Sequence, residues 1–196
     1  MEFKQLIGDC VHGDERAFRV LVEQYADFAF ASAFKILGRE EDAKDVVQES
    51  FISAWKNIKG FHPEKNFSNW LYRIIVNHCY DRLRKRKREQ FVGPDQFCLE
   101  FLADEAGNDP EKIMSNREYG ELIGKLTDGL SPKQRIAFVL CDLEGCSHDE
   151  ASSISGMAKA SLKSNLNHAR RKIGNMVVKL FDYEAGRKVR KRFEAP

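Results

Sequence analysis

A dense run of positive charge follows an aromatic-rich helical pattern in the first half of the chain. Residues 67–88 read FSNWLYRIIVNHCYDRLRKRKR, with apolar side chains such as Leu71, Ile75 and Leu83 at helical spacing. The cations near its end are Arg82, Arg84, Lys85, Arg86, Lys87 and Arg88. Cations track phosphate groups, and aromatic rings stack on exposed bases. The segment therefore predicts contact with nucleic acid. A solvated helix with a basic end, favoured by the helix dipole, is the alternative.

A second set of polar side chains lies in the last third of the chain. Residues 147–150, Ser-His-Asp-Glu, have the pattern of a capping box, so a helix begins there and can run to about Ile154 before Gly156. A longer helical pattern follows over residues 159–178. The short helix, the glycine-containing turn and the longer helix together predict a helix-turn-helix, with a plain helical hairpin as the alternative. The outward face of its second helix suits phosphates and base edges through Ser161, Lys163, Ser164, Asn167, His168 and Arg171.

Every strongly periodic segment of the sequence has helical spacing, and none shows the convincing alternation of a strand. Helices must therefore position these polar groups. Asp14 can cap a helix that must end by Gly38. A second helical pattern runs over residues 43–58, and Ser68 or Asn66 can cap the third. We therefore expect an all-α fold.

The helical periodicity lapses after residue 89, where glycine, proline and acidic residues are interspersed. It resumes at Asp109-Pro110 and again at Ser131-Pro132, each a capping residue followed by proline in the first turn. We therefore expect two small helical domains joined by a flexible acidic linker, with a basic tail. The expected division is domain 1–89, linker 90–109, domain 110–182 and tail 183–196.

Composition bounds the class of protein. The net charge of +2 hides local patches of both signs, basic at residues 82–88 and acidic in the middle of the chain. No apolar run approaches the roughly 18 residues of a membrane span, and the N-terminus lacks a signal-peptide core. Five cysteines at irregular spacing do not describe a disulfide framework. We expect a cytoplasmic protein with reduced thiols and no membrane insertion.

An enzyme and a stand-alone regulator are the competing interpretations. Cys141, Cys146 and His148 are the nearest approach to a metal site, but their spacing is wider than that of a zinc knuckle. Neither a phosphate-binding glycine loop nor a serine-histidine-acid pattern is present, so we expect no catalytic residue, metal or cofactor. A repressor or activator would read DNA through the helix-turn-helix alone and use the first domain as a ligand sensor.

Three separated motifs resemble one family. They are DAKDVVQESFISAW at residues 42–55, GFHPEKNFSNWLYRIIVNHCYDRLRKRKR at 60–88 and LSPKQRIAFVLCDLEGCSHDEASSISGMAKASLKSNLNHARRKI at 130–173. In this order and spacing the chain resembles a bacterial RNA polymerase sigma factor of the extracytoplasmic-function (ECF) group, across nearly its whole length. The resemblance implies a non-enzymatic subunit that binds core polymerase, directs it to two-element promoters and helps to melt the DNA.

The resemblance also implies roles for single residues. Asp45, Gln48 and Glu49 would meet the coiled coil of the polymerase's largest subunit, although a solvated helix face is the alternative. The flap is a further expected contact. Phe61 would capture a flipped base of the −10 element, although a core anchor for its loop is the alternative. The −10 contacts implied beside Phe61 are Asn77 and Asp81, and Arg84 and Lys85 of the basic cluster complete the expected −10 set. The −35 contacts implied are Lys163, Ser164, Asn167 and His168, and the outward Ser161 and Arg171 complete the expected −35 set. An anti-sigma factor is the implied regulatory partner.

Overall fold

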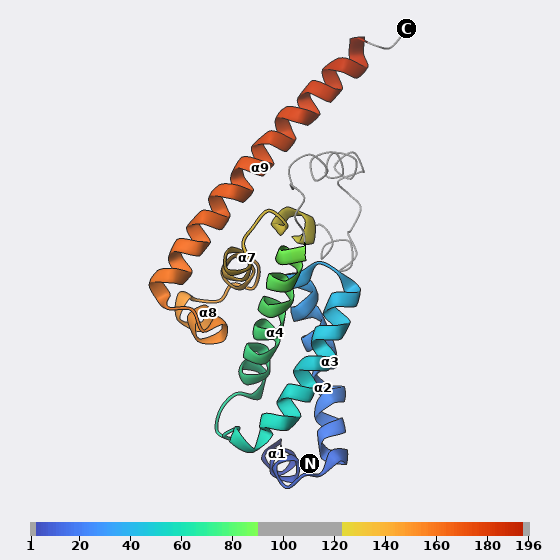
Figure 1. Cartoon of the computed structure of the whole chain (residues 1–196), viewed down its shortest axis with the longest axis vertical. Coiled ribbons are helices and arrows are strands. Elements are labelled where there is room, and N and C mark those ends of the chain that lie inside the picture. The colour runs from blue at the N-terminus through green and yellow to red at the C-terminus, as the bar shows by residue number, and fades with distance from the viewer. Residues whose placement is uncertain (1–2, 90–122, 194–196) are drawn as a thin grey trace.

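The computed structural model describes residues 3–89 and 123–193, and these residues form helices and connecting turns without a strand (Figure 1). The expected all-α class is confirmed. The expected linker at residues 90–109, the helix capped by Asp109 and Cys98 lie outside the described residues. We call residues 3–89 the first half and residues 123–193 the second half.

The first half is a helical bundle. Its elements are α1 (Phe3–Val11), α2 (Glu15–Leu37), α3 (Glu40–Asn57), the short 3-10 helix η1 (Ile58–Gly60) and α4 (Phe67–Glu89). As predicted, the Asp14 carboxylate caps α2 by accepting from the amide of Arg16 at 2.8 Å. Gly38 ends that helix with a φ of 66°, a left-handed conformation that favours glycine. The helix α1 was not predicted, although it buries Leu6, Ile7 and Cys10 at helical spacing.

The second half carries the predicted helix-turn-helix. After a helical turn at residues 123–127 come α7 (Pro132–Phe138), the π-helical turn η2 (Val139–Leu143), α8 (His148–Ser155) and α9 (Lys159–Phe193). Ser131 and Gln134 form one capping box, and Ser147 and Glu150 form another, which confirms the predicted starts of α7 and α8. Gly156 makes the left-handed turn between α8 and α9.

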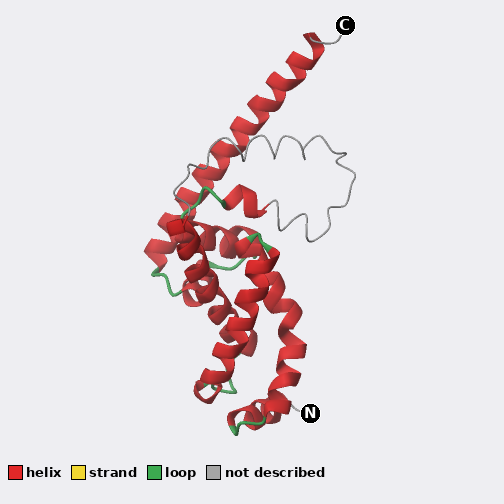
Figure 2. Cartoon of the chain, turned by 45° about the vertical axis from the view of Figure 1, so that its right-hand side comes forward, coloured by secondary structure: helices red, strands yellow, loops and turns green. Residues whose placement is uncertain are grey.

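The long helix α9 differs from the prediction at its end. The sequence pattern predicts that the second helix of the helix-turn-helix, which we call the reading helix, ends near Val178 and that a basic tail follows at residues 183–196. In the structure the helix continues to Phe193. Figures 1 and 2 show its C-terminal part extending away from the rest of the molecule. Helix-forming lysine and arginine residues are frequent in this segment, so local propensity favours the extension.

The two halves share one apolar core, in which α4 of the first half packs against α7 and α8 of the second half (Figure 1). The predicted stripe of α4 is buried at Leu71, Ile75 and Leu83 and half-buried at Ile74 and His78. A second buried stripe, which was not predicted, consists of Tyr72, Val76 and Cys79. Burial is the main cause of the raised pKa of Tyr72. The carboxylate of Glu144 and the thiol of Cys146, both in the second half, lie close enough to raise this pKa further.

Polar contacts fix the junction between the halves. The Arg135 side chain is 3% exposed; its Nη1 donates to Asp128 Oδ1 at 3.0 Å and its Nη2 donates to the Leu37 carbonyl at 3.1 Å. Arg86 of α4 donates to the same Asp128 oxygen at 2.8 Å. Burial lowers the pKa of Arg135 to about 10, against the opposing effect of Asp128, so the guanidinium stays charged at neutral pH.

The backbones of the two halves meet at a pair of glycines. A Cβ atom added to Gly124 would lie 2.7 Å from the Cα atom of Gly38, a distance that side chains essentially never adopt. Close by, the Lys35 ammonium lies 2.7 Å from a Glu144 carboxylate oxygen. The junction is therefore a tight contact in which backbone, apolar and ionic groups all take part.

Candidate nucleic-acid and partner interfaces

The row predicted to contact polymerase lies on the exposed face of α3. Asp45, Gln48 and Glu49 occur at i, i+3 and i+4, and all three are exposed. The two carboxylates already have a partner within the chain, because Arg82 of α4 lies 3.2 Å from Asp45 Oδ2 and 3.4 Å from Glu49 Oε1. Asp42 joins the same guanidinium at 3.1 Å.

This acidic network clamps α3 to α4. Partial burial opposes the charge of Arg82, but the three carboxylates, Asp42 foremost, raise its pKa above the ordinary value. His78 extends the network, since its Nδ1 lies 3.4 Å from Glu49 and its Nε2 lies 2.8 Å from the Ser53 hydroxyl. Three carboxylates face one guanidinium and one imidazole here, so the surface keeps a negative balance that suits a basic partner.

Phe61 is buried in an aromatic cluster at the start of α4. Its side chain is 5% exposed, and its ring centroid lies 5.4 Å from that of Phe67 and 5.1 Å from that of Trp70. In this arrangement neither face of the Phe61 ring is open to a base. The buried position of the ring agrees with the alternative interpretation, in which Phe61 anchors its loop to the core. A base-capture role would require the ring to leave the cluster.

The other residues of the predicted −10 set lie further along α4. Asn77 and Asp81 follow Phe67 by ten and fourteen residues, which places them about 15 and 21 Å further along the helix axis at the usual rise. Both are exposed, as are Arg84 and Lys85. The structure therefore does not bring Phe61 together with these four side chains.

The basic end of α4 divides its cations among several faces, because successive residues of a helix point in different directions. Arg82 faces the acidic row of α3, and Arg86 faces Asp128 at the junction. The sequence showed one cluster, and it could not reveal that these two cations serve internal contacts. The cations that remain exposed are Arg84, Lys85, Lys87 and Arg88.

The helix-turn-helix presents the polar face that the sequence predicted. Leu162, Leu166 and Ala169 of α9 are buried, which orients the opposite face outward. The exposed residues on α9 include Lys163, Ser164, Asn167, His168 and Arg171, while Ser161 is half-buried. Arg170 points elsewhere and forms a bidentate pair with Asp142 at 2.6 and 2.9 Å, which fixes α9 against η2.

The four cysteines that the structure describes are buried or half-buried. Cys10 and Cys79 are buried, and burial raises the pKa of Cys10 to about 11. Burial also raises the pKa of the half-buried Cys141 and Cys146, so both thiols favour the protonated form at neutral pH. Among the described residues, no group of three or more histidine, cysteine or acidic side chains could hold a metal ion.

Comparison with known proteins decides between the competing interpretations. Residues 21–89 match the family described as Sigma-70 region 2, and residues 120–173 match Sigma-70, region 4. The ECF RNA polymerase sigma factor SigW of Bacillus subtilis is 30% identical over 177 residues, which cover 87% of this chain and 94% of SigW. The chain belongs to the ECF sigma factors. Members of this family are transcription initiation factors and not enzymes.

Further relatives agree with this assignment. The sigma-E factor of Salmonella typhimurium is 31% identical over 171 residues, covering 84% of this chain and 88% of that protein. The SigE factor of Mycolicibacterium smegmatis is 30% identical over 159 residues, which cover 81% of this chain. The match spans 61% of that SigE protein, so this chain covers less than two thirds of its length.

Two solved structures share the fold of this sigma factor. CnrH, solved in complex with the cytosolic domain of CnrY, has a TM-score of 0.58 at 24% identity, covering 90% of this chain and 97% of CnrH. RpoE of Bartonella quintana, solved with the anti-sigma factor NepR, has a TM-score of 0.56 at 24% identity, covering 82% and 96%. Within residues 3–89 and 123–193, no helix is long and apolar enough to cross a membrane.

Proposed function

We propose that this ECF sigma factor binds core RNA polymerase through α3, directs it to promoters with a −10 and a −35 element, and promotes DNA melting. The observation that carries the proposal is the presence, on one chain, of an exposed acidic row on α3 and an exposed polar face on the reading helix α9. A stand-alone regulator needs only the second of these surfaces, whereas a polymerase subunit needs both.

The polymerase contact in this proposal consists of Asp45, Gln48 and Glu49. A basic surface of the largest-subunit coiled coil would compete with Arg82 for the two carboxylates, while the exposed Gln48 amide supplies hydrogen bonds without such competition. The polymerase flap is the proposed partner of the second half.

The promoter contacts in this proposal come from α4 and α9. Exposed Arg84 and Lys85 suit the phosphates of the −10 region, and Asn77 and Asp81 suit base edges. On α9, Lys163 and Arg171 suit phosphates, whereas Asn167 suits a bidentate contact with adenine in the major groove. Ser161, Ser164 and His168 complete the proposed −35 set.

Regulation by an anti-sigma factor is part of the proposal. It is supported by the fold shared with RpoE, which was solved with the anti-sigma factor NepR. We place the action of this chain in the cytoplasm, where RNA polymerase transcribes the genome.

Assembly with polymerase tests the proposal. The purified chain is mixed with core polymerase, separated by size, and the complex is offered a library of duplex promoter sequences. We expect a stable complex that enriches sequences with two conserved blocks. DNA selection by the chain alone, with no complex formed, would instead identify a stand-alone regulator.

A further inference from the structure

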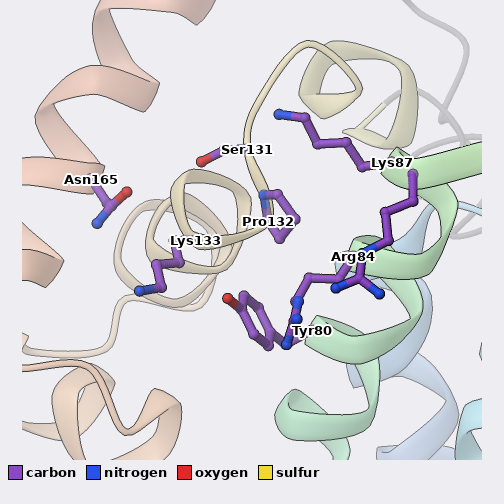
Figure 3. A pocket seen from close by; sticks show the side chains of 8 residues that line it. Tyr80, Arg84, Lys87, Ser131, Pro132, Lys133 and Asn165 are labelled. Carbon is purple, nitrogen blue, oxygen red and sulfur yellow. The ribbon is translucent and has the colours of Figure 1, made fainter. Parts of the chain in front are cut away.

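A pocket of about 350 Å³ opens where α4 meets the second half (Figure 3). The first half contributes Tyr80, Arg84, Lys87 and Arg88, and the second half contributes Ser131, Pro132, Lys133 and Asn165. Figure 3 shows Lys133 and Asn165 on one side and Arg84 and Lys87 on the other. Because both halves supply the lining, the pocket is complete only while the halves are packed together.

The lining of this junction pocket is strongly cationic. Arg84, Lys87, Arg88 and Lys133 contribute to it, and no aspartate or glutamate does. Two carboxylates that pair with arginines of this region do not belong to the lining. Asp128 accepts from Arg86 and Arg135, and Asp81 pairs with Arg84 at 3.8 Å from an exposed position.

Such convergence of like charge costs free energy unless an anion is present, because each cation raises the electrostatic potential at the others. The junction contacts hold this charge in place, since Arg135 is almost fully buried and ion-paired and the Gly38 and Gly124 backbones touch. The Arg84 guanidinium also lies 5.6 Å from the centre of the Tyr80 ring, a cation–π contact that restricts its position. The pocket is therefore a partly organised site for negative charge.

We propose that the junction pocket binds a compact phosphate-bearing anion, such as the diphosphate group of a small ligand, and that the bound anion stabilises the packed arrangement of the two halves. Arginine forks and lysine ammonium groups are the usual partners of phosphate oxygens. A ligand that requires both halves binds the packed arrangement more tightly than the separated one, and by reciprocity it shifts the population toward the packed arrangement.

Inorganic pyrophosphate is the probe for the site. Its binding to the full chain is measured by calorimetry against sodium chloride of equal ionic strength. Lys133→Ala removes the lysine contributed by the second half and should weaken binding about tenfold, the usual effect of losing one charge-assisted hydrogen bond. Lys59→Ala makes the same charge change at an exposed position outside the pocket and should leave the affinity within about twofold. Equal weakening by both variants would overturn the proposal in favour of a diffuse ion atmosphere.

A wedge at the glycine contact tests the role of the packed arrangement. Gly124→Val keeps every lining residue but places side-chain atoms against Gly38, so we expect an increased radius of gyration in X-ray scattering and at least a tenfold loss of pyrophosphate affinity. Gly174→Val adds the same side chain in open space on α9 and should change neither quantity. Circular dichroism measures the helicity of both variants, which we expect to equal that of the parent. Unchanged pyrophosphate binding by a separated Gly124→Val variant would overturn the proposal.

The phosphate could come from a small ligand or from the DNA backbone, and a third arm separates these sources. In the Gly124→Ala variant, the added methyl group is smaller than the valine side chain, and pyrophosphate should restore the packed arrangement. A short DNA duplex should compete for Arg84 and so lower the apparent affinity of the chain for pyrophosphate. If duplex DNA binds in a Lys133-dependent way while pyrophosphate shows no binding above the chloride control, the small-ligand proposal is wrong.

Discussion

Arg82 shows how one side chain can serve the fold and prepare an interface. It holds three carboxylates of α3 at 3.1 to 3.4 Å, two of which belong to the proposed polymerase contact. The pairs that Arg82 makes with the exposed Asp45 and Glu49 each contribute only about 0.2–1 kcal/mol. A partner surface that supplies several cations can therefore displace Arg82 without unfolding the bundle.

Reversing the charge of the row should abolish capture by core polymerase. In the Asp45→Lys and Glu49→Lys double variant, two attractive contacts become repulsive, while the lost pairs with Arg82 lower the free energy of unfolding by about 1 kcal/mol. Pull-down with core polymerase measures binding, and circular dichroism measures helicity. The matched Glu23→Lys and Glu64→Lys double variant changes the same charge outside the row and should bind normally. Normal binding by the first variant would mean that the row is not the interface.

Substitution of Phe61 separates anchoring from base capture. Because the ring is buried against Phe67 and Trp70, Phe61→Ala should lower the free energy of unfolding by about 3–5 kcal/mol. Phe61→Leu keeps most of the apolar volume, so it should cost less than about 1.5 kcal/mol and support promoter opening at nearly the parent rate. Opening that is slow on duplex DNA and restored on a premelted bubble in Phe61→Leu would show that the aromatic ring itself captures a base.

The helices are the scale at which sequence and structure agree most closely. Capping residues Asp14, Ser131 and Ser147 marked helix starts correctly, because a cap acts through amides two or three residues away and needs no distant partner. The second buried stripe of α4 was missed because it depends on α7 and α8, which lie more than forty residues away in the chain. The internal contacts of Arg82 with α3 and of Arg86 with Asp128 were missed because their partners lie 33 to 42 residues away in the chain.

Within α9, two neighbouring substitutions should have different effects. Asn167→Ala should relax base preference at one or two positions of the −35 element, since a bidentate base contact contributes about 1–3 kcal/mol of discrimination. Arg171→Ala should weaken binding to all sequences and reduce its salt dependence, as loss of a phosphate contact does. Binding measured over a sequence library and several salt concentrations distinguishes the two. Identical preferences and salt dependence in both variants would remove the proposed division of roles.

The two halves are packed against each other in the structure, although the proposed function requires them to bind separate DNA elements. Positions −35 and −10 differ by about 25 base pairs, which is roughly 85 Å of B-DNA at ~3.4 Å per base pair. In the structure, Arg84 of α4 and Asn165 of α9 line one pocket of about 350 Å³, so the two reading surfaces lie far closer than that. Simultaneous contact with both elements therefore requires the halves to separate.

Separation should accompany assembly with polymerase. Fluorescent labels on exposed positions of α2 and α9 report the distance between the halves, and we expect high transfer efficiency in the free chain and a large decrease in the polymerase complex. Gly124→Val should show lower efficiency before polymerase is added, because the wedge acts at the junction. High efficiency that persists in a transcribing complex would contradict the need for separation.

Promoter spacing tests most directly the central claim that one chain reads two elements while held on polymerase. Inserting about 5 base pairs between the elements turns one of them roughly half a turn away, since B-DNA repeats every ~10–10.5 base pairs. Restoring both contacts by bending or twisting the DNA would cost about 1–6 kcal/mol. Transcription by the reconstituted polymerase should therefore collapse with five added base pairs and fall less with one. Activity unchanged by the five-base-pair insertion would contradict the two-element account.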